Sequence, residues 1–251
     1  MDKRLVFFII SIIFSVSVQG ATVSGQGSWE SVLQARDLDG DPATVEAFYN
    51  VSTDTTWLAD ANLAQTSGFD SDGLLNWYAA NSWAESLNFN GVTGWRLPST
   101  SDFGNDGYSY LSTVYVGLDA GYNIRHHSEM SGLFYDVLGN SSAYNTNGTR
   151  RECAITNYPD YCLTNSGEFS INPGTYWSST EFVNNPGEAW VFDFASGFQG
   201  SDFKARVYYA WAVHAGDVGV AVIPLPTSVW LFISGLVCLI SVGRKDKKSS
   251  I

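Results

Sequence analysis

Three aspartates around a glycine form the first group of side chains in this chain that could do chemistry. Asp37, Asp39 and Asp41 alternate around Gly40 in the run Asp-Leu-Asp-Gly-Asp. Alternating carboxylates at a glycine bend can chelate a hard cation such as Ca²⁺. An EF-hand loop would carry glutamate at its twelfth position, where this chain has Phe48. The run therefore predicts either a partial Ca²⁺ site, with Ca²⁺ as the only cofactor indicated, or an ordinary polar turn.

Groups that could carry catalysis are sparse. His126 and His127 are adjacent, so in a strand they would point to opposite faces. Neither a Gly-x-Ser-x-Gly elbow nor a His-Glu-x-x-His motif is present in the sequence. A glycosidase would need two carboxyl groups about 5–10 Å apart. The acidic residues available for such a pair in the expected loop regions are Asp102, Asp106, Glu181 and Glu188.

Tryptophan is abundant, with nine residues in the chain. Four of them could form a platform on which a glycan stacks: Trp95, Trp177, Trp190 and Trp211. Aromatic residues at alternate positions of strands mostly build the core, however. The packing interpretation is favoured over the ligand-binding one.

The cysteines indicate an oxidising compartment. Cys153 and Cys162 lie nine positions apart in a region rich in Asn and Tyr, and exported proteins form disulfides in such loops. We expect a disulfide between them. Cys238 lies in a long apolar segment near the C-terminus and is expected to act there as a small hydrophobic side chain.

The elements that must position these residues belong to an α+β arrangement. Apolar residues recur at helical spacing over residues 74–88, with Asp72 as the expected N-cap, and over residues 128–138, with Ser128 as N-cap and Gly139 as the stop. Strands are predicted at residues 175–180, 189–194 and 207–214, with a turn at Ser196-Gly197. Two helices followed by a twisted antiparallel sheet leave residues 97–128 and 139–173 as long loops, where binding groups usually lie.

Charge limits the partners of this region. About 200 residues lie between two hydrophobic ends, which is the length of one domain. They carry seven basic and 23 acidic side chains, a net charge near −16. Nucleic acid and anionic lipid are excluded as partners because binding either requires Lys and Arg to neutralise phosphates.

Several short motifs together resemble the Lcl C-terminal-like domain family of exported bacterial domains. They occur in the family's order over residues 38–218 and include Thr-Trp-Leu-Ala-Asp from Thr56, Trp-Arg-Leu-Pro from Trp95, Tyr-Trp-Ser-Ser from Tyr176 and Ala-Trp-Val-Phe from Ala189. The resemblance implies a fold like that of C-type lectins and a role in surface adhesion or glycan binding. One departure is that Val213-His214-Ala215 replaces the family's Val-Arg-Pro. The chain also lacks the Glu-Pro-Asn and Trp-Asn-Asp signatures of calcium-dependent sugar binding.

Arg96, next to Trp95 in the Trp-Arg-Leu-Pro motif, is expected to organise the interior. A buried or half-buried guanidinium needs a carboxylate and carbonyl oxygens as partners. We therefore predict that Arg96 pairs with a carboxylate and nearby backbone.

The N-terminus has the three parts of a secretory signal peptide. Lys3 and Arg4 precede an uncharged apolar stretch from Leu5 to Val18, and small residues stand before Ala21. The stretch is short for a membrane span of about 20 residues, so cleavage is favoured over anchoring.

The C-terminus resembles the PEP-CTERM class of sorting signals, most closely its Val-Pro-Leu-Pro-Ala variant. Residues 221–228 contain Pro224, Leu225, Pro226 and Thr227, an apolar segment of residues 229–243 follows, and Arg244 and Lys245 begin a basic tail. The two prolines keep the motif extended, and the basic cluster predicts that the tail stays cytoplasmic. The resemblance implies an exosortase-type processing enzyme as a partner; an ordinary single-span anchor is the alternative.

These features predict the following organisation: signal peptide 1–20, ectodomain 21–220, sorting motif 221–228, transmembrane segment 229–243 and cytoplasmic tail 244–251. The protein is then expected in the cell envelope or outside the cell, held by the membrane at least transiently. The favoured function is a lectin-like binding module for a polysaccharide or matrix component. An enzyme acting on cell-surface polysaccharide and a purely structural matrix protein are the alternatives.

Overall fold

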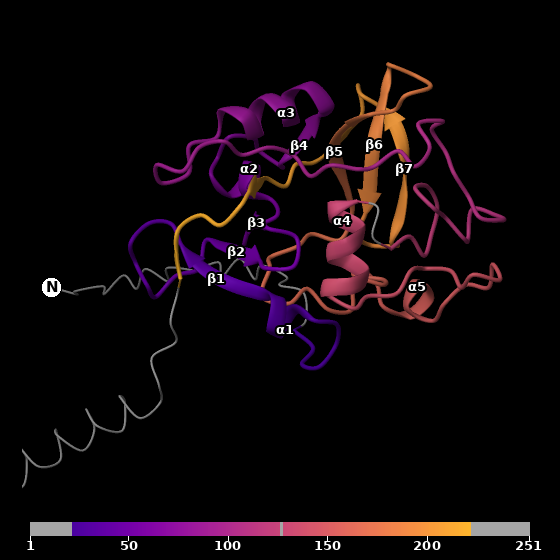
Figure 1. Ribbon diagram of the computed structural model, residues 1–251, viewed down its shortest axis with the longest axis horizontal. Helices are drawn as coiled ribbons and strands as arrows, with labels where there is room; N and C mark the ends of the chain where they lie inside the picture. Colours follow the sequence, from indigo (N-terminus) through magenta and orange to yellow (C-terminus); the bar gives the residue numbers. More distant parts are fainter. Residues whose placement is uncertain (1–21, 126–127, 222–251) are drawn as a thin grey trace, which may run out of the picture.

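Two five-stranded sheets organise the computed structural model, which describes residues 22–125 and 128–221 (Figure 1). The first sheet is antiparallel, in the order β10 (Val220–Ala221), β1 (Leu33–Asp37), β2 (Ala47–Asn50), β3 (Thr55–Leu58) and β9 (Val213–Ala215). The second follows the order β4 (Leu74–Asn76), β8 (Val207–Tyr209), β5 (Thr175–Glu181), β6 (Glu188–Asp193) and β7 (Phe198–Phe203). Its β5–β8 pair is parallel and the others are antiparallel. The predicted α+β class is confirmed.

The strands of the C-terminal third agree with the sequence pattern in two cases and differ in one. β5 covers the predicted strand at 175–180, β6 matches the one predicted at 189–194 except for its last residue, and the turn at Ser196-Gly197 leads into β7. The single strand predicted at 207–214 is wrong, because β8 and β9 belong to different sheets. Residues 210–212 between them are buried and cross from one sheet to the other.

The first predicted helix begins later than the pattern indicated. Leu74 and Leu75 pair with β8 as strand β4, so the helix α3 runs over Trp77–Ser86. Its N-cap is Asn76, whose side chain accepts a hydrogen bond from the backbone of Ala79, and not Asp72. Strand pairing satisfies the backbone of residues 74–76, which a helix would otherwise have used.

The second predicted helix is present but changes its winding. Ser128 caps α4 (Glu129–Gly132) by accepting from the backbone N–H of Ser131 at 3.1 Å, as predicted. The chain continues as a π-helix, η1 (Leu133–Val137), and turns at Gly139, whose φ of 68° favours glycine. The apolar residues of the predicted stripe are all buried: Met130, Leu133, Phe134, Val137 and Leu138.

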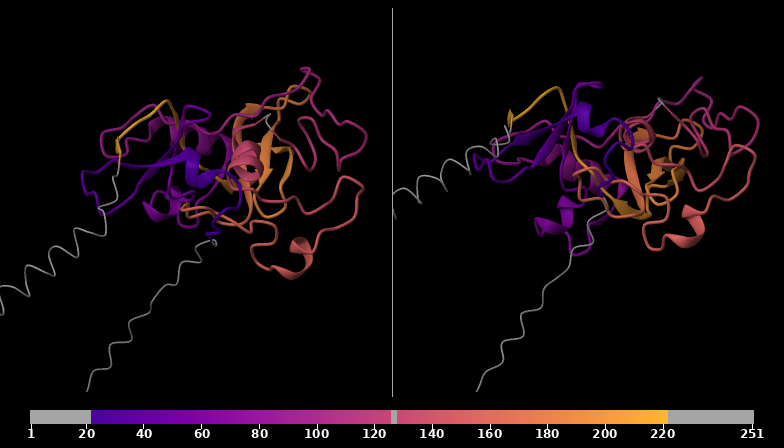
Figure 2. Two further views of the ribbon diagram at one scale, coloured as in Figure 1. Left: turned by 60° about the horizontal axis from the view of Figure 1, so that its bottom comes forward. Right: turned by 90° about the horizontal axis from the view of Figure 1, so that it is seen from below.

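Three short helices complete the described part, namely α1 (Trp29–Val32), α2 (Leu63–Thr66) and α5 (Cys153–Thr156). The two long loops predicted from the sequence, at 97–128 and 139–173, lie mostly beside β6 and β7, on the far side of the molecule from β1–β3 (Figures 1 and 2). Because these loops come from separate parts of the chain, their meeting place is where a composite site can form.

The predicted export signals lie outside the described residues. This applies to the signal peptide 1–20, to Pro224–Thr227 of the sorting motif, to the segment 229–243 and to the tail 244–251. Among residues 22–125 and 128–221, the helices are all too short or too polar to cross a bilayer.

Candidate functional site

The four tryptophans considered as a glycan platform lie in the interior. Trp95 is 2% exposed, and Trp177, Trp190 and Trp211 have no exposed surface. The indole N–H of Trp177 donates to Leu75 O at 2.8 Å, so even its polar edge is engaged inside the fold. The ligand-binding assignment of these residues is therefore wrong, and the packing interpretation holds: Trp177 and Trp190 lie where β5 and β6 are buried on both faces, and Trp95 and Trp211 lie on buried segments between strands.

Arg96 organises the interior as predicted. Its guanidinium makes a two-pronged ion pair with Glu129 in the first turn of α4, with N···O distances of 2.7 and 2.8 Å, and also donates to Leu97 O. Burial acts to raise the pKa of Glu129, but Arg96 and the donors of Ser99 outweigh it, so the pKa lies below its ordinary value. The pair ties the Trp-Arg-Leu-Pro segment to α4.

The run at Asp37 brings together a different set of carboxylates from the one predicted. Oxygens of Asp37, Asp39 and Glu46 lie within 4.8 Å of one another, whereas Asp41 is not part of this group. Glu46 enters because β1 ends at Asp37 and the chain returns directly before β2, where Glu46 accepts from Leu38 N at 3.0 Å. Asp37 and Asp39 also accept backbone N–H groups of the turn itself, at 2.6–3.0 Å. This is the bonding of a polar turn.

The carboxylates of the enzymatic alternative separate into two places. Asp102 and Asp106 lie with Asp119 so that their oxygens are within 4.8 Å. Asp119 is fully buried and accepts from the backbone of Phe103 and Ser109, and burial raises its pKa. Asp119 carries no signal in the sequence, because it stands alone in the chain, 13 positions beyond Asp106.

Glu181 and Glu188 lie on β5 and β6 and have partners of their own. The carboxylate of Glu181 pairs with the buried Lys204 at 2.6 Å. Glu188 accepts from Ser201 and Asn185 at 2.5 and 2.9 Å. Both carboxylates thus hold strands and turns in place, which is a structural use.

A pocket in the long loops has the residue types of a binding site. The disulfide between Cys153 and Cys162 is present as predicted, and it closes the loop that carries α5. Against it lies a pocket of about 240 Å³. We call it the tyrosine pocket, defined by its lining: Tyr122, Ala143, Tyr144, Arg150, Ala154, Tyr161, Asp193, Ala195 and Ser196.

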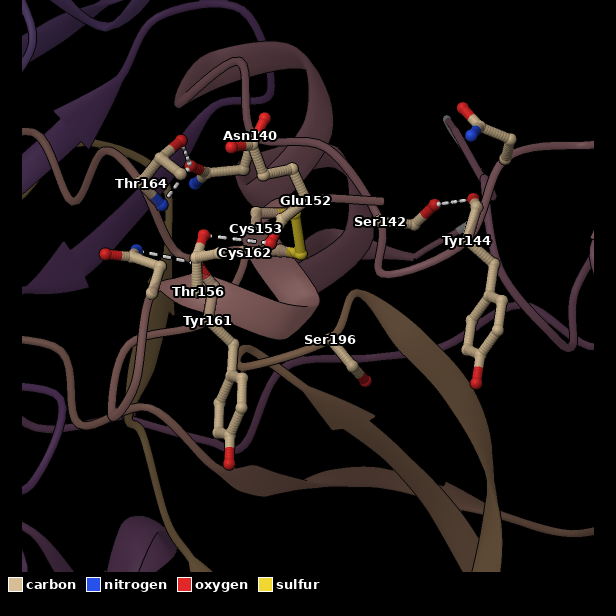
Figure 3. The surroundings of a disulfide bond; sticks show 12 residues. Asn140, Ser142, Tyr144, Glu152, Cys153, Thr156, Tyr161, Cys162, Thr164 and Ser196 are labelled. Atoms are coloured by element: carbon tan, nitrogen blue, oxygen red, sulfur yellow. Dashed lines mark hydrogen bonds between the residues drawn. A yellow bond between two sulfur atoms is a disulfide. The ribbon is translucent and has the colours of Figure 1, made fainter. Parts of the chain in front are cut away.

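The tyrosine rings of this pocket are partly exposed and firmly supported. Figure 3 shows Tyr144 and Tyr161 on either side of Ser196, with their rings extending in the same direction. Tyr144 packs against Tyr122, with ring centroids 4.9 Å apart, and both contact Tyr115. Each lining tyrosine is half-buried, so part of each ring can meet a ligand.

Tyr161 has an unusual backbone. Its φ is 48°, in the left-handed region that bulky residues rarely adopt. Its neighbour Cys162 is bound to Cys153 and donates its N–H to Ala195 O at 2.9 Å, which holds this conformation in place. Backbone strain that the surroundings maintain is found preferentially at binding sites.

Two charged groups give the pocket its polarity. Asp193 accepts from Ser196 Oγ at 2.5 Å and from Ala195 N at 3.0 Å, and burial raises its pKa against these hydrogen bonds. Arg150 is exposed and reaches the pocket from an extended segment that bridges to Tyr144. The arrangement offers aromatic faces, hydroxyl groups, one half-buried carboxyl group and one guanidinium.

A larger cavity of about 450 Å³ lies between the β2–β3 turn and the α4–η1 helix. Its polar lining includes Ser52, Ser101 and Glu129, and its aromatic member, Trp57, is only 2% exposed. Since Glu129 is already held by Arg96 and the ring of Trp57 is covered, this cavity offers little for an aromatic stacking interaction.

The tyrosine pocket was not predicted from the sequence, although the loops that form most of it were. The signal available was a set of four tyrosines, with Tyr115, Tyr122 and Tyr144 before Cys153 and Tyr161 between the two cysteines. No family model matches the chain, and neither a curated protein nor a solved structure matches it.

Proposed function

We propose that this protein is an exported binding module whose tyrosine pocket holds one sugar unit of a polysaccharide or matrix component. The observation that carries the proposal is the grouping of Tyr122, Tyr144 and Tyr161 around a pocket next to Arg150 and Asp193. Tyrosine combines a flat apolar face with a hydroxyl group and loses little conformational freedom on binding. Sugars present both apolar C–H faces and hydroxyl groups, so they match this lining.

The size of the pocket sets the scale of the ligand. Pockets for drug-sized molecules occupy about 300–1,000 Å³, and the tyrosine pocket has about 240 Å³. It therefore fits a single unit, with the rest of a polymer continuing over the exposed loop surface. Exposed rings and aliphatic groups on that surface, such as Ile155 and Tyr158 of the disulfide loop, would add contact area.

The proposal extends to the fold and the location of the protein. The two sheets with long loops on one side support a C-type-lectin-like domain, in which loops rather than strands carry the ligand. The apolar and basic residues of the C-terminus support anchoring outside the cytoplasmic membrane, with processing by an exosortase-type enzyme near Pro224–Thr227. Intact-mass measurement of protein recovered outside the cell tests the processing. A mature C-terminus at Ile251 would identify an ordinary anchor.

Retention on glycans tests the binding function. The full-length chain would be applied to a glycan array and to extracellular polymer from its own source, alongside Tyr144→Ala and Tyr161→Ala. Tyr78→Ala is the matched control, because Tyr78 is 60% exposed on α3, far from α5 (Figure 1).

We expect both pocket variants to lose about tenfold or more in retention, the equivalent of about 1.4 kcal/mol, and the control to bind as the wild type does. Near-UV circular dichroism would verify that all variants are folded. Folded wild-type protein that is retained on no polymer, or pocket variants that are retained fully, would contradict the proposal.

A further inference from the structure

The pairing of basic residues singles out the tyrosine pocket within the described part of the chain. Residues 22–221 contain seven Lys and Arg side chains. Four of them form ion pairs: Arg36 with Asp217, Arg96 with Glu129, Arg125 with Asp136 and Lys204 with Glu181. Arg150, Arg151 and Arg206 make no side-chain ion pair or hydrogen bond with any residue in 22–125 or 128–221. Of these three, Arg150 lines the pocket.

Arg150 is unpaired although the domain has 23 acidic side chains. Acidic residues outnumber basic ones about threefold, so a guanidinium has many possible partners near it. Arg150 follows a short turn in which Asn145 N donates to Thr149 O, and it makes no ion pair with a described carboxylate. Its planar group stays available for a carboxylate, which it can bind through two parallel hydrogen bonds.

We infer that the sugar unit bound in the tyrosine pocket carries a carboxylate, as a uronic acid does, and that Arg150 binds this group while the tyrosines contact the ring. The inference rests on the proposed function. It adds the chemical class of the ligand and names the residue that selects it.

The other charge of the pocket is compatible with this assignment. Both oxygens of Asp193 already accept hydrogen bonds, from Ser196 Oγ and Ala195 N. Asp193 is half-buried whereas Arg150 is exposed, so the carboxyl group belongs to the wall and the guanidinium to the rim. A ligand carboxylate at the rim meets the cation first.

The net charge of the domain further limits which acidic polysaccharides can bind. A charge near −16 repels a densely charged polyanion over the whole surface. A local Arg–carboxylate contact survives this repulsion because it is short and screened from distant charges by salt. The inferred ligand is therefore a polysaccharide with isolated uronic acids among neutral sugars. Heavily sulfated chains are excluded as ligands.

A pair of probes that differ only in the carboxylate tests the inference. One probe is an oligosaccharide with a single glucuronic acid, and the other is the same oligosaccharide after reduction of that carboxyl group to a primary alcohol. Binding of both to the full-length chain would be measured by isothermal titration calorimetry. Arg150→Gln would be compared with Arg206→Gln, which removes the same charge from another exposed and unpaired arginine.

We expect the wild type and Arg206→Gln to prefer the acidic probe about tenfold or more, as for a hydrogen-bonded charge pair. Arg150→Gln would bind the two probes within about twofold of each other. Equal binding of both probes by the wild type, with loss of binding in Tyr144→Ala, would overturn the carboxylate inference and leave the saccharide function standing. Absence of binding of either probe, together with no effect of Tyr144→Ala on polymer retention, would overturn both.

Discussion

The tryptophan core and the tyrosine pocket use the same class of side chain, and they differ in the backbone that carries the rings. Trp177, Trp190 and Trp211 lie on strands or on the segment that joins two sheets, and none has exposed surface. Tyr144 and Tyr161 lie on loops next to a disulfide and remain half-exposed. Strands of a covered sheet have both faces buried, whereas a loop can leave one face of a ring in water.

The polar groups of two buried rings form hydrogen bonds inside the fold. Trp211 donates its indole N–H to Leu58 O at 2.8 Å, and Tyr176 donates its hydroxyl to Asn172 O at 3.0 Å. These polar groups are therefore already bonded within the fold and do not face a ligand. In this protein, an aromatic residue can therefore be assigned to binding only after its burial and its polar partners are known.

Removing a core tryptophan should have the largest effect on stability. Trp177→Ala is expected to lower the free energy of unfolding by about 3–5 kcal/mol, because it leaves a large cavity and removes the hydrogen-bond donor of the Leu75 carbonyl. Urea denaturation followed by circular dichroism measures this. Tyr144→Ala is the counterpart from the pocket, with an expected loss of about 1 kcal/mol or less. Wild-type stability for Trp177→Ala would show that the core and the pocket do not differ in this way.

Opening the disulfide should have the next largest effect. Cys153→Ala with Cys162→Ala removes a cross-link that closes a short loop, with an expected loss of about 2–3 kcal/mol in the free energy of unfolding. Because the same loop carries Tyr161, retention on polymer should fall as well. A doubly substituted protein that unfolds more readily but binds unchanged would show that the pocket does not depend on this support.

The Arg96–Glu129 pair should contribute stability that depends on pH. Glu129→Gln is expected to cost about 1.5–3 kcal/mol at neutral pH, the usual range for hydrogen bonds to charged groups. The pKa of Glu129 is lower in the folded protein than its ordinary value of 4.5. The stabilisation is therefore complete above about pH 4.5 and is lost as pH falls through the lower pKa of the folded state.

Denaturation curves between pH 7 and pH 3 measure this effect, and the difference between wild type and Glu129→Gln should shrink toward the acidic end. Arg150→Gln provides the contrast from the pocket. Since Arg150 is exposed and pairs with no described residue, its substitution should change stability by no more than about 0.5 kcal/mol at any pH in this range. A pH-independent difference for Glu129→Gln would mean that the carboxylate gains nothing from Arg96.

The smallest effect is expected from removing one hydroxyl group. Tyr144→Phe keeps the ring, so polymer retention should fall by only about two- to tenfold, the equivalent of one neutral hydrogen bond. Thermal unfolding should match that of the wild type. A loss as large as that of Tyr144→Ala would indicate that the hydroxyl group, and not the aromatic face, makes the principal contact.

Local patterns in the sequence were sufficient for much of the framework. The residue pattern from Ser128 predicted both the cap and the buried face of α4–η1, and local sequence patterns predicted β5 and β6. The proximity of Cys153 and Cys162 predicted the disulfide. Each of these depends on residues close in the chain, where backbone geometry alone dictates which side chains share a face.

Other features were decided by contacts between distant segments. Leu74 and Leu75 became a strand because β8 offered them partners, and residues 207–214 divided between two sheets. The tyrosine pocket combines Tyr122, Arg150 and Asp193 from three segments that no periodic pattern connects. The burial of a ring and the pairing of a cation both depend on how distant segments pack together. Only the tertiary structure could therefore separate the tryptophans of the core from the tyrosines of the pocket.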